Sequence, residues 1–293
     1  METLEGLGRR IATTEDLESI VKTMKSLSAV SIKQYEDSVA SLKVYSHALE
    51  LGFHVALQGF AHALPARSSH GSLAVIVFGS DHGLCGRFNE QIGDVAREHA
   101  HAGEDPPAKV HWLVVGGRAA ARLEAAGERP EETLMLPGAP SGLVATSQAV
   151  IMIVDRWRRE AGVERVLLVH NQRTEHATAT PEVRQVLPLD PGWLRTLMTA
   201  PWPSRRLPTY SMAVDDLFAT LVREYLFLSV YRAGAESLSS EHATRLLAMQ
   251  AAERNIDETL DELSGMYRRM RQDSITEELL DVVAGFEVLE TQD

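Results

Sequence analysis

The segment MQAAERNIDETLDELSGMYRRM, residues 249–270, decides the fold because its apolar residues repeat with the period of a helix. They occur at steps of three and four, at Met249, Ala252, Ile256, Leu260, Leu263, Tyr267 and Met270. One-sided spacing that continues over several turns is typical of a coiled-coil seam. The segment therefore predicts a long helix that buries one apolar stripe against another helix.

A matching stripe lies in the N-terminal part of the chain. Apolar residues recur from Leu4 to Phe53, mostly at steps of three or four, with polar Ser28 falling near the seam. All 12 prolines of the chain lie between Pro65 and Pro208. Because a proline inside a helix costs about 3 kcal/mol, the proline-free flanks predict two long helices around a compact middle domain.

The lengths of these helices determine how they are arranged. A helix of about 50 residues is about 75 Å long, whereas a compact chain of this size is only about 45–50 Å across. The terminal helices therefore cannot both lie inside one globule, and antiparallel pairing lets each stripe bury the other. We expect an N-terminal shaft helix over residues 1–62 and a C-terminal shaft helix over residues 210–291.

The middle of the chain predicts an α/β domain over residues 70–192, followed by a proline-rich connector over residues 193–209. The expected strands are 72–78, 110–115, 133–136, 165–173 and 182–189, and the expected helices between them are 87–101, 118–126 and 143–160. This alternation favours a Rossmann-like, largely parallel sheet with helices on both faces. The predicted fold class is therefore α/β, with a long antiparallel coiled coil of the terminal helices.

Composition argues against several classes of function. The formal net charge of −12 disfavours general nucleic-acid binding, which needs a basic face. No apolar run approaches the roughly 18 residues that span a bilayer, so no direct membrane insertion is expected. The single cysteine excludes a zinc site built from several thiolates, and the 11 histidines show no metal-binding spacing, so we expect no metal. The acidic start METLE does not resemble a secretory signal, which favours the cytoplasm.

The turn GSDHGLCG, residues 79–86, is the strongest candidate for chemistry because it follows an expected strand and precedes an expected helix. A nucleotide-binding fold would hold a phosphate at this position. The chain contains no GxxxxGK[ST] motif and this turn is not GxGxxG, so a tight connection that needs several glycines is favoured over a phosphate cradle. Cys85 and His82 could form a nucleophile and its base. The sequence places no third group beside them, so Cys85 is expected to be a small packed residue.

Four stretches of the chain resemble the gamma subunit of F-type ATP synthases. They are EHATRLLAMQAAERN at 241–255, RQDSITEEL at 271–279, Arg10-Ile11 with IVKTMK at 20–25, and SDHGLCG at 80–86. The four occur in the family's order and cover both ends and the middle of the chain. The resemblance implies a central rotor stalk that couples ion flow through a membrane c-ring to the conformational cycle of catalytic beta subunits.

The resemblance also implies partners, a location and contact residues. The expected partners are the alpha and beta subunits of a hexameric ring, the epsilon subunit and the c-ring, at the cytoplasmic face of the bacterial inner membrane. ATP chemistry would take place in that ring, so the chain is expected to be non-catalytic and to bind no cofactor. The expected ring contacts are Met24, Arg245, Met249, Arg271, Gln272, Thr276 and Glu278. The family's turn motif maps onto Ser80, Asp81, Gly83, Leu84, Cys85 and Gly86.

The sequence departs from the family at informative positions. His82 stands where arginine is usual, and Glu287, Glu290 and Asp293 occupy a tip that is small and apolar in many members. This pattern is similar to the divergent "alternate" ATPases that are proposed to pump sodium.

Two other hypotheses remain open at this point. A non-rotary coiled-coil scaffold would form a self-sufficient homodimer and leave ATP hydrolysis unchanged. A nucleotide-dependent enzyme would bind nucleotide through the α/β domain, which calorimetry on the isolated chain would detect.

Overall fold

The computed structural model describes residues 3–59, 71–102, 107–176, 178–203, 205 and 208–290. These residues form two compact units, one of Ser28–Arg245 and one of Met1–Leu27 with Leu246–Asp293. Two long helices, α1 (Leu4–Gly59) and α6 (Val214–Glu290), contribute to both units. The prediction of long terminal helices is therefore confirmed. The predicted boundaries between domains are not tested by this division and stay predictions.

The unit of Ser28–Arg245 contains a five-stranded sheet in the order β3-β2-β1-β4-β5. The strands are β1 (Ser72–Phe78), β2 (Val110–Val115), β3 (Glu132–Leu134), β4 (Val163–Gln172) and β5 (Thr180–Leu187). The first four strands are parallel, and β5 pairs antiparallel with β4. The connection from β4 to β5 is short, whereas a parallel neighbour needs a crossover of a dozen residues or more. The predicted, largely parallel sheet is confirmed.

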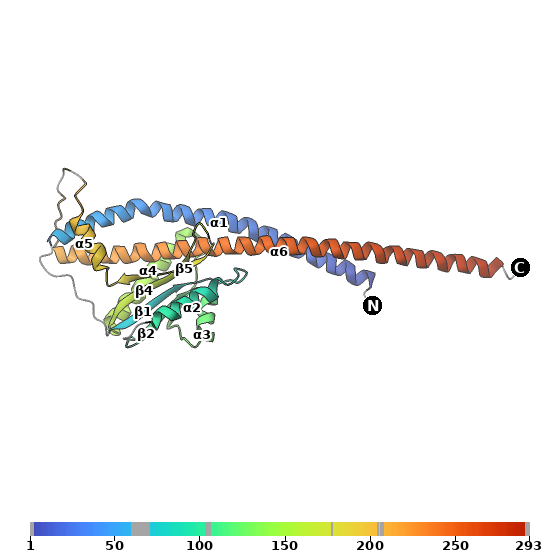
Figure 1. Ribbon diagram of the computed structural model, residues 1–293, viewed down its shortest axis with the longest axis horizontal. Coiled ribbons are helices and arrows are strands. Elements are labelled where there is room, and N and C mark those ends of the chain that lie inside the picture. The colour runs from blue at the N-terminus through green and yellow to red at the C-terminus, as the bar shows by residue number, and fades with distance from the viewer. Residues whose placement is uncertain are drawn as a thin grey trace. The chain divides into compact units, whose positions relative to one another are not determined.

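Helices cover both faces of this sheet (Figure 1). On one face lie α2 (Phe88–Ala100) and α3 (Gly117–Ala125), and on the other lie α4 (Leu143–Glu160), which follows a 3-10 turn (Pro140–Gly142), and part of α6. Alternate residues of β1 join the two clusters, with Ala74, Ile76 and Phe78 in one and Leu73, Val75 and Val77 in the other. A strand buried on both faces reads as a continuous apolar run, which is why its sequence shows no alternation.

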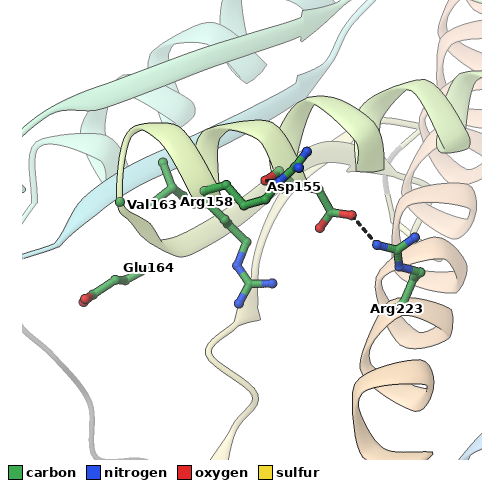
Figure 2. Close-up of a pocket in the computed structure, with 7 residues that line it drawn as sticks. Asp155, Arg158, Val163, Glu164 and Arg223 are labelled. Atoms are coloured by element: carbon green, nitrogen blue, oxygen red, sulfur yellow. Dashed lines mark hydrogen bonds and ion pairs between the residues drawn. The ribbon is translucent and has the colours of Figure 1, made fainter. Parts of the chain in front are cut away.

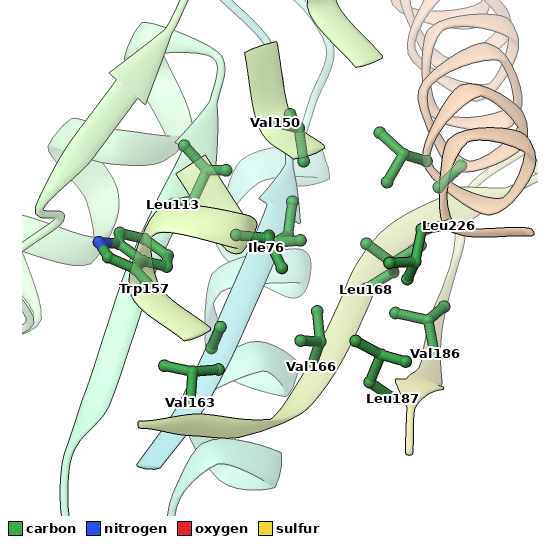
Figure 3. Close-up of a cluster of buried hydrophobic side chains, with 14 of the residues drawn as sticks. Ile76, Leu113, Val150, Trp157, Val163, Val166, Leu168, Val186, Leu187 and Leu226 are labelled. Atoms are coloured by element: carbon green, nitrogen blue, oxygen red, sulfur yellow. The ribbon is translucent and has the colours of Figure 1, made fainter. Parts of the chain in front are cut away.

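The larger cluster ties α6 to the sheet. Figure 3 shows Ile76 and Leu168 of the sheet among the side chains of Val150 and Trp157 from α4 and Leu226 from α6. Burying one side chain of this size contributes about 1.5–3 kcal/mol. The α6 segment of this unit is therefore part of the domain core.

A helix that the sequence analysis did not predict, α5 (Pro191–Thr199), begins at the end of the α/β domain and occupies the first part of the expected connector. Proline fits the first position of a helix, and Asp190 caps it by accepting the amide protons of Gly192 (3.0 Å) and Trp193 (3.3 Å). Its buried residue Leu194 packs in a cluster with Phe53 of α1. The prolines of this segment predicted a connector without a helix of its own, and residues 191–199 are helical. The bounds of the connector stay a prediction.

Within the unit of Ser28–Arg245, α1 and α6 run antiparallel. The Tyr45 hydroxyl donates to Glu224 at 2.5 Å. Further along α1, a methyl group at Gly52 would lie 2.7 Å from Leu221. Near the end of α1, Gly59 lies against Val214. The residue numbers of the α6 partners therefore decrease as those of α1 increase, which shows that the two helices are antiparallel.

The unit of Met1–Leu27 with Leu246–Asp293 shows the same antiparallel pairing. Lys25 forms an ion pair with Glu253 at 2.5 Å, and a methyl group at Gly8 would lie 3.9 Å from Tyr267. Stripe residue Leu263 is 2% exposed. The predicted antiparallel pairing is therefore confirmed within each unit. Among the described helices, none is long and apolar enough to cross a membrane.

A zero-length carbodiimide cross-link tests this register. The Lys25 amine lies 2.5 Å from the Glu253 carboxylate, so the full chain should give a Lys25–Glu253 cross-linked peptide by mass spectrometry. Glu253→Gln should remove this product and leave the i,i+4 product of Lys33 and Asp37 unchanged. Cross-linking of Lys25 to a carboxylate two turns away on α6 would show that the register is wrong.

Candidate functional site

The glycine-rich turn, residues 79–86, lies at the carboxyl edge of the sheet between β1 and α2. A methyl group at Gly79 would lie 2.1 Å from the Ala119 side chain of α3. Gly116, after β2, has φ of +121°, and a methyl group there would lie 2.8 Å from the Ser80 amide nitrogen. These glycines allow two strand–helix connections to approach each other closely, as expected of a tight turn.

The Asp81 carboxylate occupies the donors that a phosphate would need. It accepts hydrogen bonds from the amide of Gly117 at 2.8 Å and from the amide of Leu136 at 2.7 Å. Gly117 is the first residue of α3, so Asp81 stabilises the positive end of this helix. A phosphate approaching the same amides would meet a fixed negative charge. The turn is therefore poorly suited to be a phosphate cradle.

Ser80 is fully buried, and its polar groups are satisfied by Asn89 of α2 and by the carbonyl of His82. The Ser80 amide donates to Asn89 Oδ1 at 2.9 Å, and Asn89 Nδ2 donates to the Ser80 hydroxyl at 2.7 Å. The Ser80 hydroxyl in turn donates to the carbonyl of His82 at 2.7 Å. This network fixes the turn but leaves the hydroxyl no role as a nucleophile.

Cys85 is also a packed residue. Its side chain is 1% exposed, and Sγ lies 3.6 Å from the Ser80 hydroxyl. Burial raises the pKa of the Cys85 thiol, so it is protonated near neutral pH. In the described part of the chain the thiol contacts the carbonyl of His82, and the His82 ring makes no hydrogen bond with it. The neighbouring residue Leu84 is exposed and has a φ of +63°. The arrangement does not provide an activated nucleophile.

Helix α6 closes the carboxyl edge of the sheet over this turn. Ser237 Oγ donates to the carbonyl of Phe78 at 3.1 Å, at the end of β1. Two turns further along α6, the Arg245 guanidinium pairs with Glu241 at 2.5 Å and donates to the carbonyl of Gly83 at 3.4 Å. The edge where a nucleotide-binding fold holds its ligand is thus covered by the chain's own helix.

Glu241 is a functional candidate that the sequence analysis missed. Its carboxylate is 4% exposed, and burial raises its pKa despite the opposing charge of Arg245. Its Oε2 atom has no partner among the described residues. The i,i+4 spacing to Arg245 was the available signal, but only the fold shows that the pair is buried. Arg245 is itself 7% exposed, and its role as a ring contact stays a prediction.

The other predicted ring contacts lie in the unit of Met1–Leu27 with Leu246–Asp293. Met249 is buried in the helix seam and Met24 is half-buried. The residues predicted in the 271–279 motif are exposed, namely Arg271, Gln272, Thr276 and Glu278. Because Lys25 pairs with Glu253, Met24 lies near residue 252, roughly 28 Å along the helix from residue 271. The structure therefore separates the predicted contacts into two groups.

A cavity of about 790 Å³ lies at the opposite, amino edge of the sheet, where α4 ends and β4 begins. Figure 2 shows Arg158 and Asp155 of α4 facing this space, with Asp155 paired to Arg223 of α6 at 2.8 Å. Arg158 and Arg159 lie in the last turn of α4 and stabilise the negative end of this helix. The described residues that line the cavity include no Ser, Cys or His, so they offer no nucleophile.

Comparisons with known proteins agree with this geometry. A protein-family model described as ATP synthase matches residues 3–289. The ATP synthase gamma chain of Bdellovibrio bacteriovorus is 24% identical over 99% of each chain. The gamma chain of Anaeromyxobacter sp. (strain Fw109-5) is 28% identical over 99% of this chain and 100% of the relative.

Two solved structures of the Euglena gracilis mitochondrial ATP synthase are similar in fold. A chain of its rotor has a TM-score of 0.62 and 15% identity, covering 93% of this chain and 98% of the solved chain. A chain of its OSCP/F1/c-ring structure has a TM-score of 0.66 and 18% identity, covering 98% and 94%. These likenesses confirm the predicted fold, an α/β domain with long terminal helices.

Replacing Gly79 with alanine tests the close approach in the turn. The added methyl would lie 2.1 Å from Ala119, so Gly79→Ala should lower the free energy of unfolding by about 1–3 kcal/mol. Urea unfolding followed by tryptophan fluorescence measures this change. The matched control is Gly138→Ala, where the methyl meets nothing within 4 Å. Equal stability of the two variants would refute the packing argument.

His242 makes the stability of the chain depend on pH. Its ring stacks on Tyr35 at 5.9 Å, and burial, assisted by the charge of Arg245, lowers the pKa of His242 to about 4. Between pH 4 and about 6.5 the unfolded state binds a proton that the folded state does not. Folding stability is therefore present above about pH 6.5 and is lost as pH falls.

His242→Phe keeps an aromatic ring there but cannot bind this proton. Urea unfolding should show that its loss of stability from pH 7 to pH 5 is smaller than that of the parent chain by about 1–2 kcal/mol. His99→Phe, at an exposed position, is the control. An unchanged pH dependence in His242→Phe would contradict the role of His242.

Proposed function

The chain belongs to the ATP synthase gamma family, and from this premise we propose that it is the non-catalytic central shaft of a bacterial ATP synthase. It transmits rotation between a membrane-embedded c-ring and a ring of alpha and beta subunits that carries the catalytic sites. Among the described residues, no feature favours the scaffold hypothesis over this one.

The exposed apolar stripe on the last part of α6 is the observation that best supports a surrounding ring. Ile275, Leu279 and Val282 recur at helical spacing and are 56%, 62% and 58% exposed. Pairing of Gly8 with Tyr267 places the start of α1 near residue 271, so α1 does not reach this stripe. A continuous row of exposed apolar side chains is typical of a protein–protein interface. A sleeve of alpha and beta subunits would bury it.

The non-catalytic role is supported by the closed edge of the sheet. Asp81 occupies the amides that could bind a phosphate, α6 covers the edge, and the Cys85 thiol is buried. These features also argue against the hypothesis of a nucleotide-dependent enzyme.

We propose that the exposed polar residues of the 271–279 motif contact the beta subunits. In the described part of the chain neither Arg271 nor Glu278 forms an ion pair, so both are available to a partner. Exposed ion pairs and hydrogen bonds contribute only about 0–1 kcal/mol each, which allows a shaft to break and remake them as it turns. We propose that Met24, Arg245 and Met249 also contribute to the ring contacts, with the buried side chains of Arg245 and Met249 supporting the helix surface that the ring meets.

The further partners proposed are the epsilon subunit and the c-ring, with the complex at the cytoplasmic face of the inner membrane. The acidic tip residues support the hypothesis of a sodium-type complex. Sodium dependence of ATP hydrolysis by the membrane-bound complex would test it, and insensitivity to sodium with a proton-type c-ring would reject it.

Co-expression with the cognate alpha and beta subunits tests the proposed function. With the chain present, we expect a stable complex containing one copy per ring and a much faster turnover of ATP than the ring alone shows. A ring that neither binds the chain nor changes its rate would reject the shaft role.

Alanine substitution of the motif tests the proposed contacts. Arg271→Ala/Gln272→Ala removes two exposed contacts, so ATP turnover by the assembled ring should fall about 5- to 30-fold, corresponding to about 1–2 kcal/mol. Arg268→Ala/Arg269→Ala, on the preceding turn, is the matched control and should retain most of the activity. Wild-type turnover in the first variant would show that these residues do not contact the ring productively.

A further inference from the structure

Three potential metal ligands converge on one side of the sheet, near the carboxyl end of β4. His170 of β4 and Glu182 of β5 are direct partners across the two strands, and Glu236 of α6 faces them. One ligand atom from each residue lies within 4.8 Å of the other two. His170 is 1% exposed and follows the core residue Leu168 by two positions on β4, so the histidine side of the cluster is buried. The residues are far apart in the sequence, which explains why no spacing motif revealed them.

The distances suit a small divalent ion. His170 Nε2 lies 2.9 Å from Glu236 Oε2 and 3.6 Å from Glu182 Oε2. A tetrahedral ion with bonds of about 2.0–2.2 Å places its ligand atoms about 3.3 Å apart. The two observed distances lie on either side of this value, so small side-chain shifts would complete the coordination.

Both carboxylates are already oriented by an arginine. Arg232 Nε donates to Glu236 Oε1 at 3.1 Å, and an Arg184 guanidinium nitrogen donates to Glu182 Oε1 at 2.6 Å. In each carboxylate the other oxygen, Oε2, points toward His170. Ligands of metal sites are held by hydrogen bonds to outer residues in this way. The side chains of the two arginines are 35–40% exposed, and their charges help to lower the pKa of Glu236, which keeps this ligand ionised.

A cavity of about 190 Å³ adjoins the cluster and is lined by Glu236 and Ser239, among others. Ser239 is 4% exposed, and its hydroxyl has no partner among the described residues. A water molecule takes about 30 Å³, so the cavity has room for several. The buried Nδ1 of His170 is likewise without a partner in the described part of the chain, and it can carry the proton when Nε2 binds a metal.

We propose that His170, Glu182 and Glu236 form a binding site for a divalent transition-metal ion of the zinc type. Imidazole with carboxylates is a donor set that binds Zn²⁺ and Co²⁺. Because Glu236 also lines the adjoining cavity, water from that cavity could complete the coordination, with the Ser239 hydroxyl as a hydrogen-bond partner for it. A bound ion joins β4 and β5 to α6, and so fixes the helix to the α/β domain.

Titration of the full chain with Co²⁺ tests this site, because tetrahedral and five-coordinate Co²⁺ absorb visible light much more strongly than the aqueous ion. We expect one equivalent to bind with the appearance of these bands, and Zn²⁺ to displace it. Glu182→Gln and His170→Gln should each weaken binding at least tenfold. The control is His176→Gln, an exposed histidine between β4 and β5, which should bind as the parent chain does.

Thermal melting separates a lost site from a lost fold. Zn²⁺ should raise the Tm of the parent chain, as any ligand specific to the folded state does. The Glu182→Gln variant, altered at a partly exposed position, should fold without metal and lose this shift. Absence of saturable Co²⁺ binding up to about 0.1 mM, or binding of parent strength in both Glu182→Gln and His170→Gln, would overturn the proposal.

Discussion

The structure depends on covering the apolar stripe of one helix, α6, whose surroundings change along its length. Residues around Leu226 pack into the core of the α/β domain, and the segment from Glu253 to Tyr267 pairs with α1. Beyond residue 271 the stripe continues through Leu279 and Val282 with no partner from the described part of the chain. Burial of apolar surface is the dominant favourable term in folding and association. One part of α6 thus completes the domain core, and the last part exposes an apolar stripe that another subunit could bury.

The α/β domain shows how a fold can resemble a nucleotide-binding domain without offering its site. The carboxyl edge of a parallel sheet is where such domains bind ligands. In this chain Asp81 binds the amides at that edge, and Ser237 and Arg245 attach α6 above it. The amides that could have recognised a ligand are occupied by Asp81, and the carbonyls of Phe78 and Gly83 attach the long helix to this edge. This arrangement suits an element that must transmit force through α6.

Much of the fold could be predicted from the sequence because its signals are local. The strands 72–78 and 110–115 are continuous apolar runs, and the long helices carry periodic stripes without proline. Helix α5 was not predicted because a proline can either break a helix or occupy its first position. At Pro191 the hydrogen bond from the Gly192 amide to the Asp190 side chain identifies the start of a helix. The buried pair of Glu241 and Arg245, and the convergence of His170 with Glu182 and Glu236, depend on tertiary packing. Residue spacing allows the pairing of Glu241 with Arg245, but it shows neither the burial of this pair nor the convergence of the three ligands.

The most direct test of the shaft role is to observe rotation of the α/β domain relative to the assembled ring. A bead can be attached to the 71% exposed Met152 position through Met152→Cys, because the native Cys85 is buried and its thiol has a raised pKa. With the alpha and beta ring fixed to a surface, the account predicts that ATP drives stepwise rotation of the bead in one direction. ATP hydrolysis at full rate while beads remain stationary on correctly assembled complexes would contradict it.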